Sequence, residues 1–428
     1  MMNIIELFFS KPNNKNVPRL SVKNLDDFKY FNEAKNIFIL FKDYDKNCKP
    51  KLIGGCVRKL ISGERIDDID IAINLEPNKI KKALEEKNVK FIETGIAHGT
   101  ITVLSNDYKF EITSLRKDIS TDGRHAEVQF INDWEADSKR RDFTINAIYS
   151  DITGEIYDPL EGIGDLAKGK IKFIGDPNLR IKEDYLRILR YLRFFTQYTK
   201  NNIHDKETVK AIKLNLDGLL KISKERLLEE LFKIVKLDNF NKLFEDSFCK
   251  FVTLSIFPQL QNFSRIKNLD KVYNKTNIKI DKILLLSILL IDKTDNCDFF
   301  LFKYPISNEN KKIILFIKSC FQDYSLEYFY LKKNLIKLIY LNNKDLVTKL
   351  LIFLIFINSK KMNIIIDLVE FTKEVKIPKF PIKAEYLMKE FNLVEGKELG
   401  RALKKIENYW LENSFNIDIK NIKKKFKF

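Results

Sequence analysis

The spacing of apolar and polar residues divides the chain into two parts that predict different secondary structure. Up to about residue 158, FKYFNEAKNIFILFKDY and VRKLISG have helical spacing, DIDIAIN alternates as a strand does, and ITVLSNDYKFEITSLR indicates a hairpin. Strands that alternate with helices predict an α/β domain for this part of the chain.

Beyond residue 158, strand patterns nearly vanish and apolar residues recur at helical spacing, as in EDYLRILRYLRFFTQY, SKERLLEELFKIVKL and ELGRALKKIENYWLEN. The longest apolar run, LLIFLIFI at residues 350–357, is far shorter than the ~20 residues that span a bilayer, so we predict a buried helix there. The fold class predicted is an α/β head followed by an extended all-helical region.

The chain has 428 residues, which is too long for one hydrophobic core. No repeat of fixed period and no long Gly, Ser or Pro linker separates its parts. We predict an N-terminal extension over residues 1–30, a head over 31–158, a helical neck over 159–245, and a helical body and tail over 246–428 that bind RNA.

The net charge of +17 and the pI of about 9.3 favour a polyanionic partner, either nucleic acid or an anionic membrane surface. An AT-biased genome would also enrich Lys, Asn and Ile, so the charge is not decisive. The five cysteines form no CxxC pair, and the N-terminus lacks the basic region of a signal peptide. We therefore predict a cytoplasmic protein without a zinc or redox motif.

Two aspartates in the predicted strand are candidates for metal binding. Asp68 and Asp70 are two residues apart, so they point to the same face of the strand. Such a pair repels itself unless a cation lies between the carboxylates, and Mg²⁺ prefers carboxylate and phosphate oxygens. In a phosphoryl or nucleotidyl transferase, the pair would hold metals that activate the attacking hydroxyl and shield the leaving pyrophosphate. A solvated strand end would show the same pattern.

A glycine-rich turn precedes these aspartates. Gly54 and Gly55 lie where a strand passes into a helix, and backbone amides at such a turn can approach phosphate. Arg58, on the first helical turn, is placed to clamp a triphosphate. One short helix thus joins a phosphate-binding turn to a metal-binding pair, a combination that favours a nucleotide site.

The segment GGCVRKLISGERIDDIDIAI resembles the signature of the class II tRNA nucleotidyltransferase and bacterial poly(A) polymerase family. The further family motifs follow in order as KFEITSLR, KRRDFTINAIYSD, EDYLRILRYLRF and SKERLLEELFKI, between about residues 50 and 237. Lys59 departs from the family pattern, which has Asp there. The resemblance implies a polymerase-β-like head, Mg²⁺ as cofactor, CTP and ATP as substrates, and the tRNA acceptor arm as partner, with no membrane and no obligate protein partner.

Base selection is predicted for the fourth motif. Asp184 and Arg187 are three residues apart and would share one face of a helix. A carboxylate accepts from the amino group of ATP or CTP, and a guanidinium donates to the adjacent ring nitrogen, whereas UTP and GTP present a carbonyl to the carboxylate. The protein itself would then act as the template, which the resemblance also implies. Glu183 is expected to orient Arg187, and Arg190 to approach the nucleotide.

The resemblance assigns roles to other residues as well. It implies that Arg141 and Arg193 contact the nucleotide, and that Asp142 helps to position the active-site elements. Glu111 is either a third carboxylate beside the aspartates or a solvent-facing strand residue. The polar residues 117–138 are predicted to be a long loop, which in the family is mobile and helps the switch from C to A addition.

These inferences predict an enzyme that adds C, C and A to the 3′ end of tRNA and releases pyrophosphate. A poly(A) polymerase, or an enzyme that adds only CC or only A, would have nearly the same motifs. A different alternative is an RNA-binding protein with an inactive head, against which the intact Asp68 and Asp70 argue.

Overall fold

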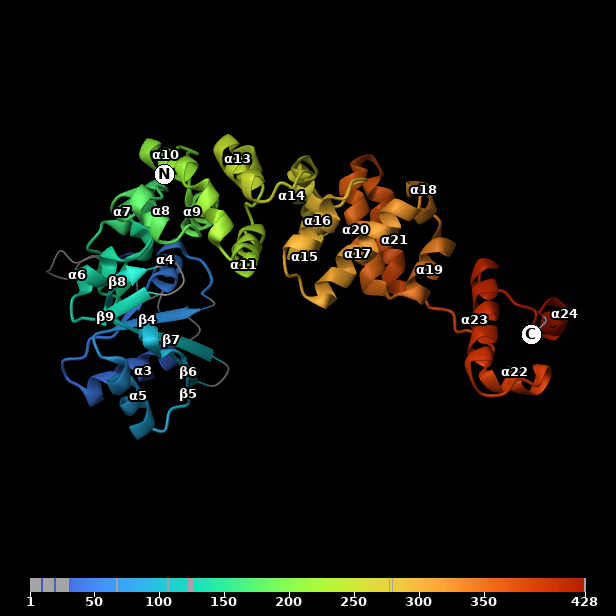
Figure 1. The fold of residues 1–428 in the computed structure, drawn as a ribbon, viewed down its shortest axis with the longest axis horizontal. Helices are drawn as coiled ribbons and strands as arrows, with labels where there is room; N and C mark the ends of the chain where they lie inside the picture. The colour runs from blue at the N-terminus through green and yellow to red at the C-terminus, as the bar shows by residue number, and fades with distance from the viewer. Residues whose placement is uncertain are drawn as a thin grey trace. The chain divides into compact units, whose positions relative to one another are not determined.

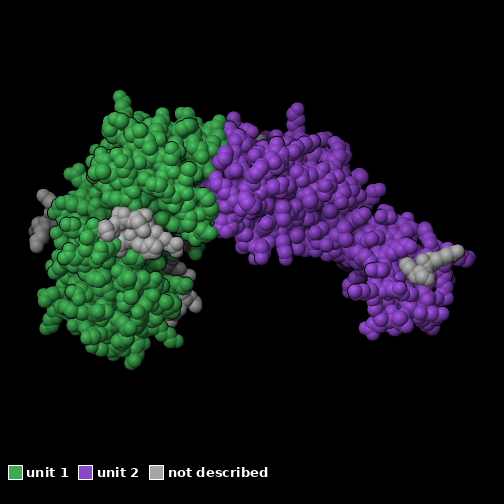
Figure 2. All heavy atoms as spheres, viewed as in Figure 1, with its two compact units in different colours: residues 1–256 green, residues 257–428 purple. Residues whose placement is uncertain are grey.

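The computed structural model describes residues 9–10, 19–20, 31–66, 68–105, 108–121, 126–276, 278 and 280–426. Most of the predicted N-terminal extension lies outside the described residues. The chain forms two compact units, residues 1–256 and 257–428, which Figure 2 colours separately. The predicted fold class, an α/β head followed by helices, is confirmed. The predicted division between neck and body at residue 245 stays a prediction.

A mixed sheet with the strand order β11-β10-β3-β4-β7-β6-β5 is the centre of the head (Figure 1). Its strands are β3 (Lys51–Ile53), β4 (Ile69–Ile73), β5 (Phe91–Gly95), β6 (Thr100–Ser105), β7 (Tyr108–Ser114), β10 (Tyr149–Ser150) and β11 (Ile156–Tyr157). β4 and β7 are parallel, and the other neighbouring strands are antiparallel. β6 and β7 confirm the predicted hairpin, although residues 106–107 at its turn lie outside the described residues.

Three helices pack around this sheet, and they are α3 (Phe31–Tyr44), α4 (Gly55–Ser62) and α5 (Pro77–Glu86). α3 contacts α5, α5 contacts β6, and α4 contacts both β3 and β4. The β4 side chains of Ile69, Ile71 and Ile73 are buried, as strand alternation predicts. α4 ends at Gly63, whose φ of 68° is left-handed, so the predicted helix and its glycine stop are confirmed.

The polar segment 117–138 is not the long loop predicted from its sequence. β8 (Arg116–Thr121) and β9 (Ala126–Phe130) pair as an antiparallel ribbon, and α6 (Trp134–Lys139) follows. The side chain of Asp133 caps α6 by accepting from the backbone amides of Glu135 and Ala136. Charged residues hide the strand alternation in this ribbon, and residues 122–125 between its strands lie outside the described residues.

The helices that follow the sheet in the first unit are α7 (Gly162–Lys168), α8 (Pro177–Glu183), α9 (Arg187–Tyr198), α10 (Lys206–Leu214), α11 (Lys224–Val235), α12 (Lys242–Glu245) and α13 (Ser247–Ile256). α9 contacts α8, α11 and α12. It buries Ile188, Leu192 and Phe195, while its arginines follow a different stripe. Two of these arginines bind carboxylates, Arg187 that of Glu183 and Arg190 that of Asp142.

The second unit is helical in its described residues and contains α14 (Leu269–Thr276), α15 (Lys282–Leu290), α16 (Asn296–Lys303), α17 (Asn308–Asp323), α18 (Leu326–Phe329), α19 (Lys332–Leu341), α20 (Lys344–Ile357), α21 (Met362–Glu374), α22 (Ala384–Phe391), α23 (Lys397–Glu412) and α24 (Ile422–Lys425). The apolar run in α20 is buried from Leu350 to Phe356, as predicted. Leu387, Ile406 and Ile422 join α22, α23 and α24 in a separate small core.

Two glycines of α7 give a matched test of packing beside the active-site region. A Cβ on Gly162 would lie 2.2 Å from the backbone carbonyl oxygen of Thr144, whereas a Cβ on Gly164 would meet nothing within 4 Å. We expect Gly162→Ala to lower the free energy of unfolding by about 1–3 kcal/mol, because backbone must move. Gly164→Ala should be neutral or slightly stabilising. Thermal unfolding of both variants measures this, and equal melting temperatures would contradict it.

Candidate active site

The glycine-rich turn lies between a strand and a helix, as predicted. Gly54 links β3 to α4 with φ of 65° and ψ of −122°, a region that favours glycine. Its amide donates at 3.3 Å to the carbonyl of Ile148, the residue just before β10. Gly55 then begins α4, whose first amides have no acceptor within the helix. These amides at the start of α4 are therefore available as hydrogen-bond donors.

Arg58 is buried and joins this turn to the neck. Its side chain is 5% exposed, and Nε donates to the hydroxyl of Tyr198 at 2.9 Å. Its guanidinium also donates to Oδ1 of Asn146 and lies over the ring of Phe194, 4.7 Å from the centroid. The arginine therefore fixes α4 against α9, and its predicted contact with a triphosphate stays a prediction.

The parallel pairing of β4 and β7 brings two carboxylates side by side. Asp70 lies opposite Glu111 in the register of these strands, and Asp68 directly precedes β4. The pKa of Asp70 is raised to about 6, first by burial and then by the Glu111 carboxylate. Asp68 adds to this increase, and Arg141 opposes it. A cation would relieve the strain between these charges, and an all-oxygen donor set fits Mg²⁺.

Asp142 lies at the centre of a hydrogen-bonded chain. Its Oδ1 accepts from Asn146 at 2.8 Å, and its Oδ2 accepts from Nε of Arg190 at 2.7 Å. Burial alone would raise the pKa of Asp142, but Arg190 and Asn146 hold it well below its usual range. Because Arg58 binds the same asparagine, the chain runs from Tyr198 through Arg58, Asn146 and Asp142 to Arg190. Asp142 and Arg190, both predicted site residues, are thus brought together.

Asp137, which was not among the predicted site residues, organises the two arginines of the third motif. It is 1% exposed and accepts from Nε of Arg140 at 2.8 Å, from Nη2 of Arg141 at 3.1 Å and from the hydroxyl of Tyr149 at 2.7 Å. Burial would raise the pKa of Asp137, but Arg141 and Arg140 hold it below its usual range. Its spacing of four residues from Arg141 was the available signal.

The fourth motif is not one continuous helix, which corrects the sequence prediction. α8 ends at Glu183 and α9 begins at Arg187, and Asp184 between them has extended backbone with φ of −151° and ψ of 105°. Asp184 and Arg187 therefore do not share a helical face. The break has a physical cause, because Oδ1 of Asp184 accepts from the amide of Leu186 at 3.1 Å and competes with helical hydrogen bonding.

Arg187 has the partner that was predicted for it. Its Nη1 donates to Oε2 of Glu183 at 2.6 Å and to the carbonyl of Arg180 at 2.8 Å. Arg180, which sequence reasoning missed, also pairs with Glu183 and donates to the carbonyl of Arg141 at 2.5 Å. The third and fourth motifs are joined through this arginine.

Asp184 has a partner that sequence reasoning did not pair with it. Its Oδ2 accepts from Nη2 of Arg226 on α11 at 2.7 Å. Arg193 lies in an ion pair of its own, with Nε donating to Glu230 at 2.5 Å and the guanidinium over the ring of Phe194. The predicted contact of Arg193 with the nucleotide stays a prediction.

An open cavity of about 540 Å³ adjoins these residues. Arg140, Arg180 and Glu183 line one part of it, and residues of β8 and α6 line another. The cavity therefore lies beside Arg180 and Glu183, the residues that hold Arg187.

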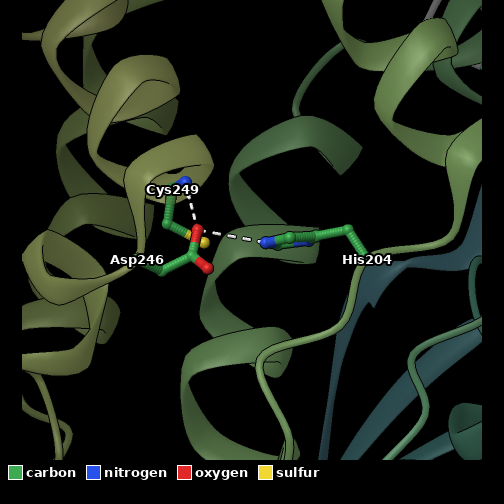
Figure 3. Close-up of side chains that lie close together, drawn as sticks. All are labelled: His204, Asp246 and Cys249. Carbon is green, nitrogen blue, oxygen red and sulfur yellow. Dashed lines mark hydrogen bonds and ion pairs between the residues drawn. The ribbon is translucent and has the colours of Figure 1, made fainter.

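A second polar cluster lies among the helices of the first unit, and Figure 3 shows its three side chains. Ligand atoms of His204, Asp246 and Cys249 all lie within 4.8 Å of one another, and no other such group of three occurs among the described residues. One ring nitrogen of His204 bonds to the hydroxyl of Tyr191 at 2.9 Å and the other to Asp246 at 3.0 Å. Because both nitrogens have partners, and Phe195 stacks on the ring, we interpret the cluster as a structural link.

The chain matches known protein families both in the head and in the helices that follow it. The family model described as the Poly A polymerase head domain matches residues 51–172, and the one described as a probable RNA and SrmB-binding site of polymerase A matches residues 204–262. The mitochondrial CCA tRNA nucleotidyltransferase 1 of Danio rerio is 32% identical over 372 residues, covering 86% of this chain and 84% of that protein. The chain belongs to the CCA tRNA nucleotidyltransferase family. The family resemblance predicted from the motifs is thus confirmed, and the chain is a nucleotidyltransferase.

Solved structures of family members have the same fold. The Bacillus stearothermophilus CCA-adding enzyme in complex with CTP matches with a TM-score of 0.68 at 21% identity, over 90% of this chain and 93% of that one. The Thermotoga maritima CCA-adding enzyme complexed with tRNA matches with a TM-score of 0.63 at 20% identity, over 94% and 97%. Every helix in the described part of this chain is too short or too polar to cross a membrane.

Proposed function

We propose that this protein adds C, C and A to the 3′ end of tRNA from CTP and ATP. The observation that carries the proposal is the alignment of this chain with a CCA tRNA nucleotidyltransferase over 84% of that protein's length. The paired carboxylates and the glycine turn in the head support it. Each addition forms a phosphodiester bond between the RNA 3′ oxygen and the α-phosphorus, and breaks the bond to pyrophosphate.

Asp68 and Asp70 would hold Mg²⁺ in this reaction, and Glu111, opposite Asp70, would support them. Mg²⁺ when bound there supplies positive charge at the reacting phosphate and lowers the pKa of the attacking hydroxyl. The pKa of Asp70 is raised first by burial and then by the Glu111 carboxylate, and this supports the assignment, because a bound cation would stabilise the ionised form of Asp70.

The triphosphate would lie at the turn before α4. Gly55 and the next residues of the first turn of α4 offer backbone amides there, while the Gly54 amide is bound to the Ile148 carbonyl. A Cβ on Gly54 would lie 3.9 Å from Nη1 of Arg141. Arg141 is thus close enough to the turn to add positive charge. Arg58 holds the turn through Asn146 and Tyr198, so its contribution includes positioning the backbone.

The base would be read by Asp184 and Arg187. Asp184 accepts from the amino group of cytosine or adenine, and Arg187 donates to the neighbouring ring nitrogen. Glu183 and the Arg180 carbonyl hold one nitrogen of Arg187, which leaves its other N–H groups to face a base. Since Asp184 lies outside the helix, its hydrogen bonds with the Leu186 amide and Arg226 determine where its carboxylate points, and helical spacing does not.

The helices beyond the head would bind the tRNA acceptor arm. A match to an RNA-binding family model over residues 204–262 and the net charge of +17 support this role. Cytoplasmic location stays a prediction, since the Danio rerio relative is a mitochondrial protein.

A poly(A) polymerase is the second candidate, because both matching family models are described by that activity. Incubation with Mg²⁺, labelled CTP and ATP, and a tRNA transcript that lacks CCA separates the two. We expect two cytidines and then one adenosine. A long adenosine ladder would indicate a poly(A) polymerase, addition of only CC or only A would indicate a partial enzyme, and no incorporation into any RNA would overturn the enzymatic assignment.

A further inference from the structure

Arg226 contacts one residue of the proposed base-reading pair and comes from a distant part of the sequence. It lies in the first turn of α11, where Ser223 caps the helix by accepting from its amide at 3.4 Å. Its Nη2 donates to Oδ2 of Asp184 at 2.7 Å, and the two side chains are 27% and 19% exposed. The ion pair between Arg226 and Asp184 is therefore half-buried.

Asp184 depends on this contact more than a helical residue would. Its backbone is extended, so no helix fixes the direction of its side chain. Two contacts hold the carboxylate, the Leu186 amide on Oδ1 and Arg226 on Oδ2. Each carboxylate oxygen has two lone pairs, so Asp184 can accept from a base amino group without releasing Arg226.

The two base-reading residues belong to separate ion pairs. Arg226 pairs with Asp184, and Glu183 pairs with Arg187 at 2.6 Å. Asp184 and Arg187 are only three residues apart. Without Arg226 and Glu183 as partners, they could form an ion pair with each other. Such a pair would consume the acceptor and a donor that a base needs at the same time.

We propose that Arg226 is a positioning residue for nucleotide selection, which keeps Asp184 directed as an acceptor and apart from Arg187. The inference rests on the proposed function, in which Asp184 and Arg187 read the base. It predicts that loss of Arg226 weakens the preference for CTP over UTP. A misdirected Asp184 carboxylate would no longer accept a hydrogen bond from the amino group of cytosine or repel the carbonyl oxygen of uracil.

Steady-state addition to a tRNA that lacks CCA, with CTP or UTP as the single nucleotide, tests this role. We expect Arg226→Ala to raise KM for CTP and to lower the CTP-over-UTP preference by about tenfold, with kcat at saturating CTP changed by about twofold at most. Arg226→Lys should retain most of the preference. Lys233→Ala is the matched control, since it also removes an ion-paired cation from α11, and it should keep the preference of the unaltered protein.

A double-variant cycle separates this inference from the proposed function. In the background of Asp184→Ala, adding Arg226→Ala should change the preference no further. If Asp184→Ala alters the preference but Arg226→Ala does not, or if the two losses add, the role of Arg226 is overturned and base reading by Asp184 stands. If Asp184→Ala leaves the preference unchanged, base reading by Asp184 is overturned, and the role of Arg226 with it.

Discussion

Asp70→Asn is expected to slow nucleotide addition by about a thousandfold, because an amide of the same shape is a much weaker ligand for Mg²⁺. The same substitution should leave the stability of the fold unchanged or increase it. The folded-state pKa of about 6 lies above the ordinary 3.8, so ionisation of Asp70 costs the fold stability, and this cost is fully present above pH 6. The melting temperature at pH 7.5, measured without divalent ions, should therefore stay the same or rise.

Single-turnover addition of CMP measures the rate, and a filter-binding assay measures the affinity for tRNA, which should be nearly unchanged. Asp68→Ala is expected to give a similar loss of transfer. Asp43→Asn, on the exposed face of α3 in the same head, is a suitable control and should keep full activity. Full activity of the Asp68 or the Asp70 variant would refute the assignment of that residue as a metal ligand.

Arg187→Ala is expected to reduce the selectivity for CTP over UTP by about ten- to a hundredfold, which corresponds to losing one base-specific contact of about 1–3 kcal/mol. Its guanidinium is the proposed donor to the ring nitrogen, and Glu183 and the Arg180 carbonyl hold it in place. Competition between labelled CTP and UTP on a tRNA that lacks CCA measures this selectivity directly.

Lys182→Ala provides the comparison, because it removes an exposed cation from α8 close to the same site. It should leave the selectivity between CTP and UTP unchanged. If the Arg187→Ala variant adds CMP with the original selectivity, Arg187 does not read the base.

The features that the sequence determined by itself are those that depend on short spacings. A glycine pair after an apolar strand predicted the turn at Gly54, where φ is indeed positive. Strand alternation predicted that Ile69 faces the core while the aspartates flank it. The Glu183 to Arg187 contact was predicted as well. Turn conformation, strand alternation and contacts between residues three or four apart all depend on neighbours in the chain, so the local sequence is enough to predict them.

Only the tertiary structure determined the partners that come from distant segments. Tyr198 lies 140 residues from Arg58, and Arg226 lies 42 residues from Asp184, yet each pair shares a hydrogen bond. The chain has 76 lysines and arginines, so the sequence offers no rule for choosing between them. The break at Asp184 has the same origin, because an unbroken apolar period predicted one helix. Contacts of that carboxylate with the Leu186 amide and with α11 stabilise the break, and these contacts exist only once the neck has folded.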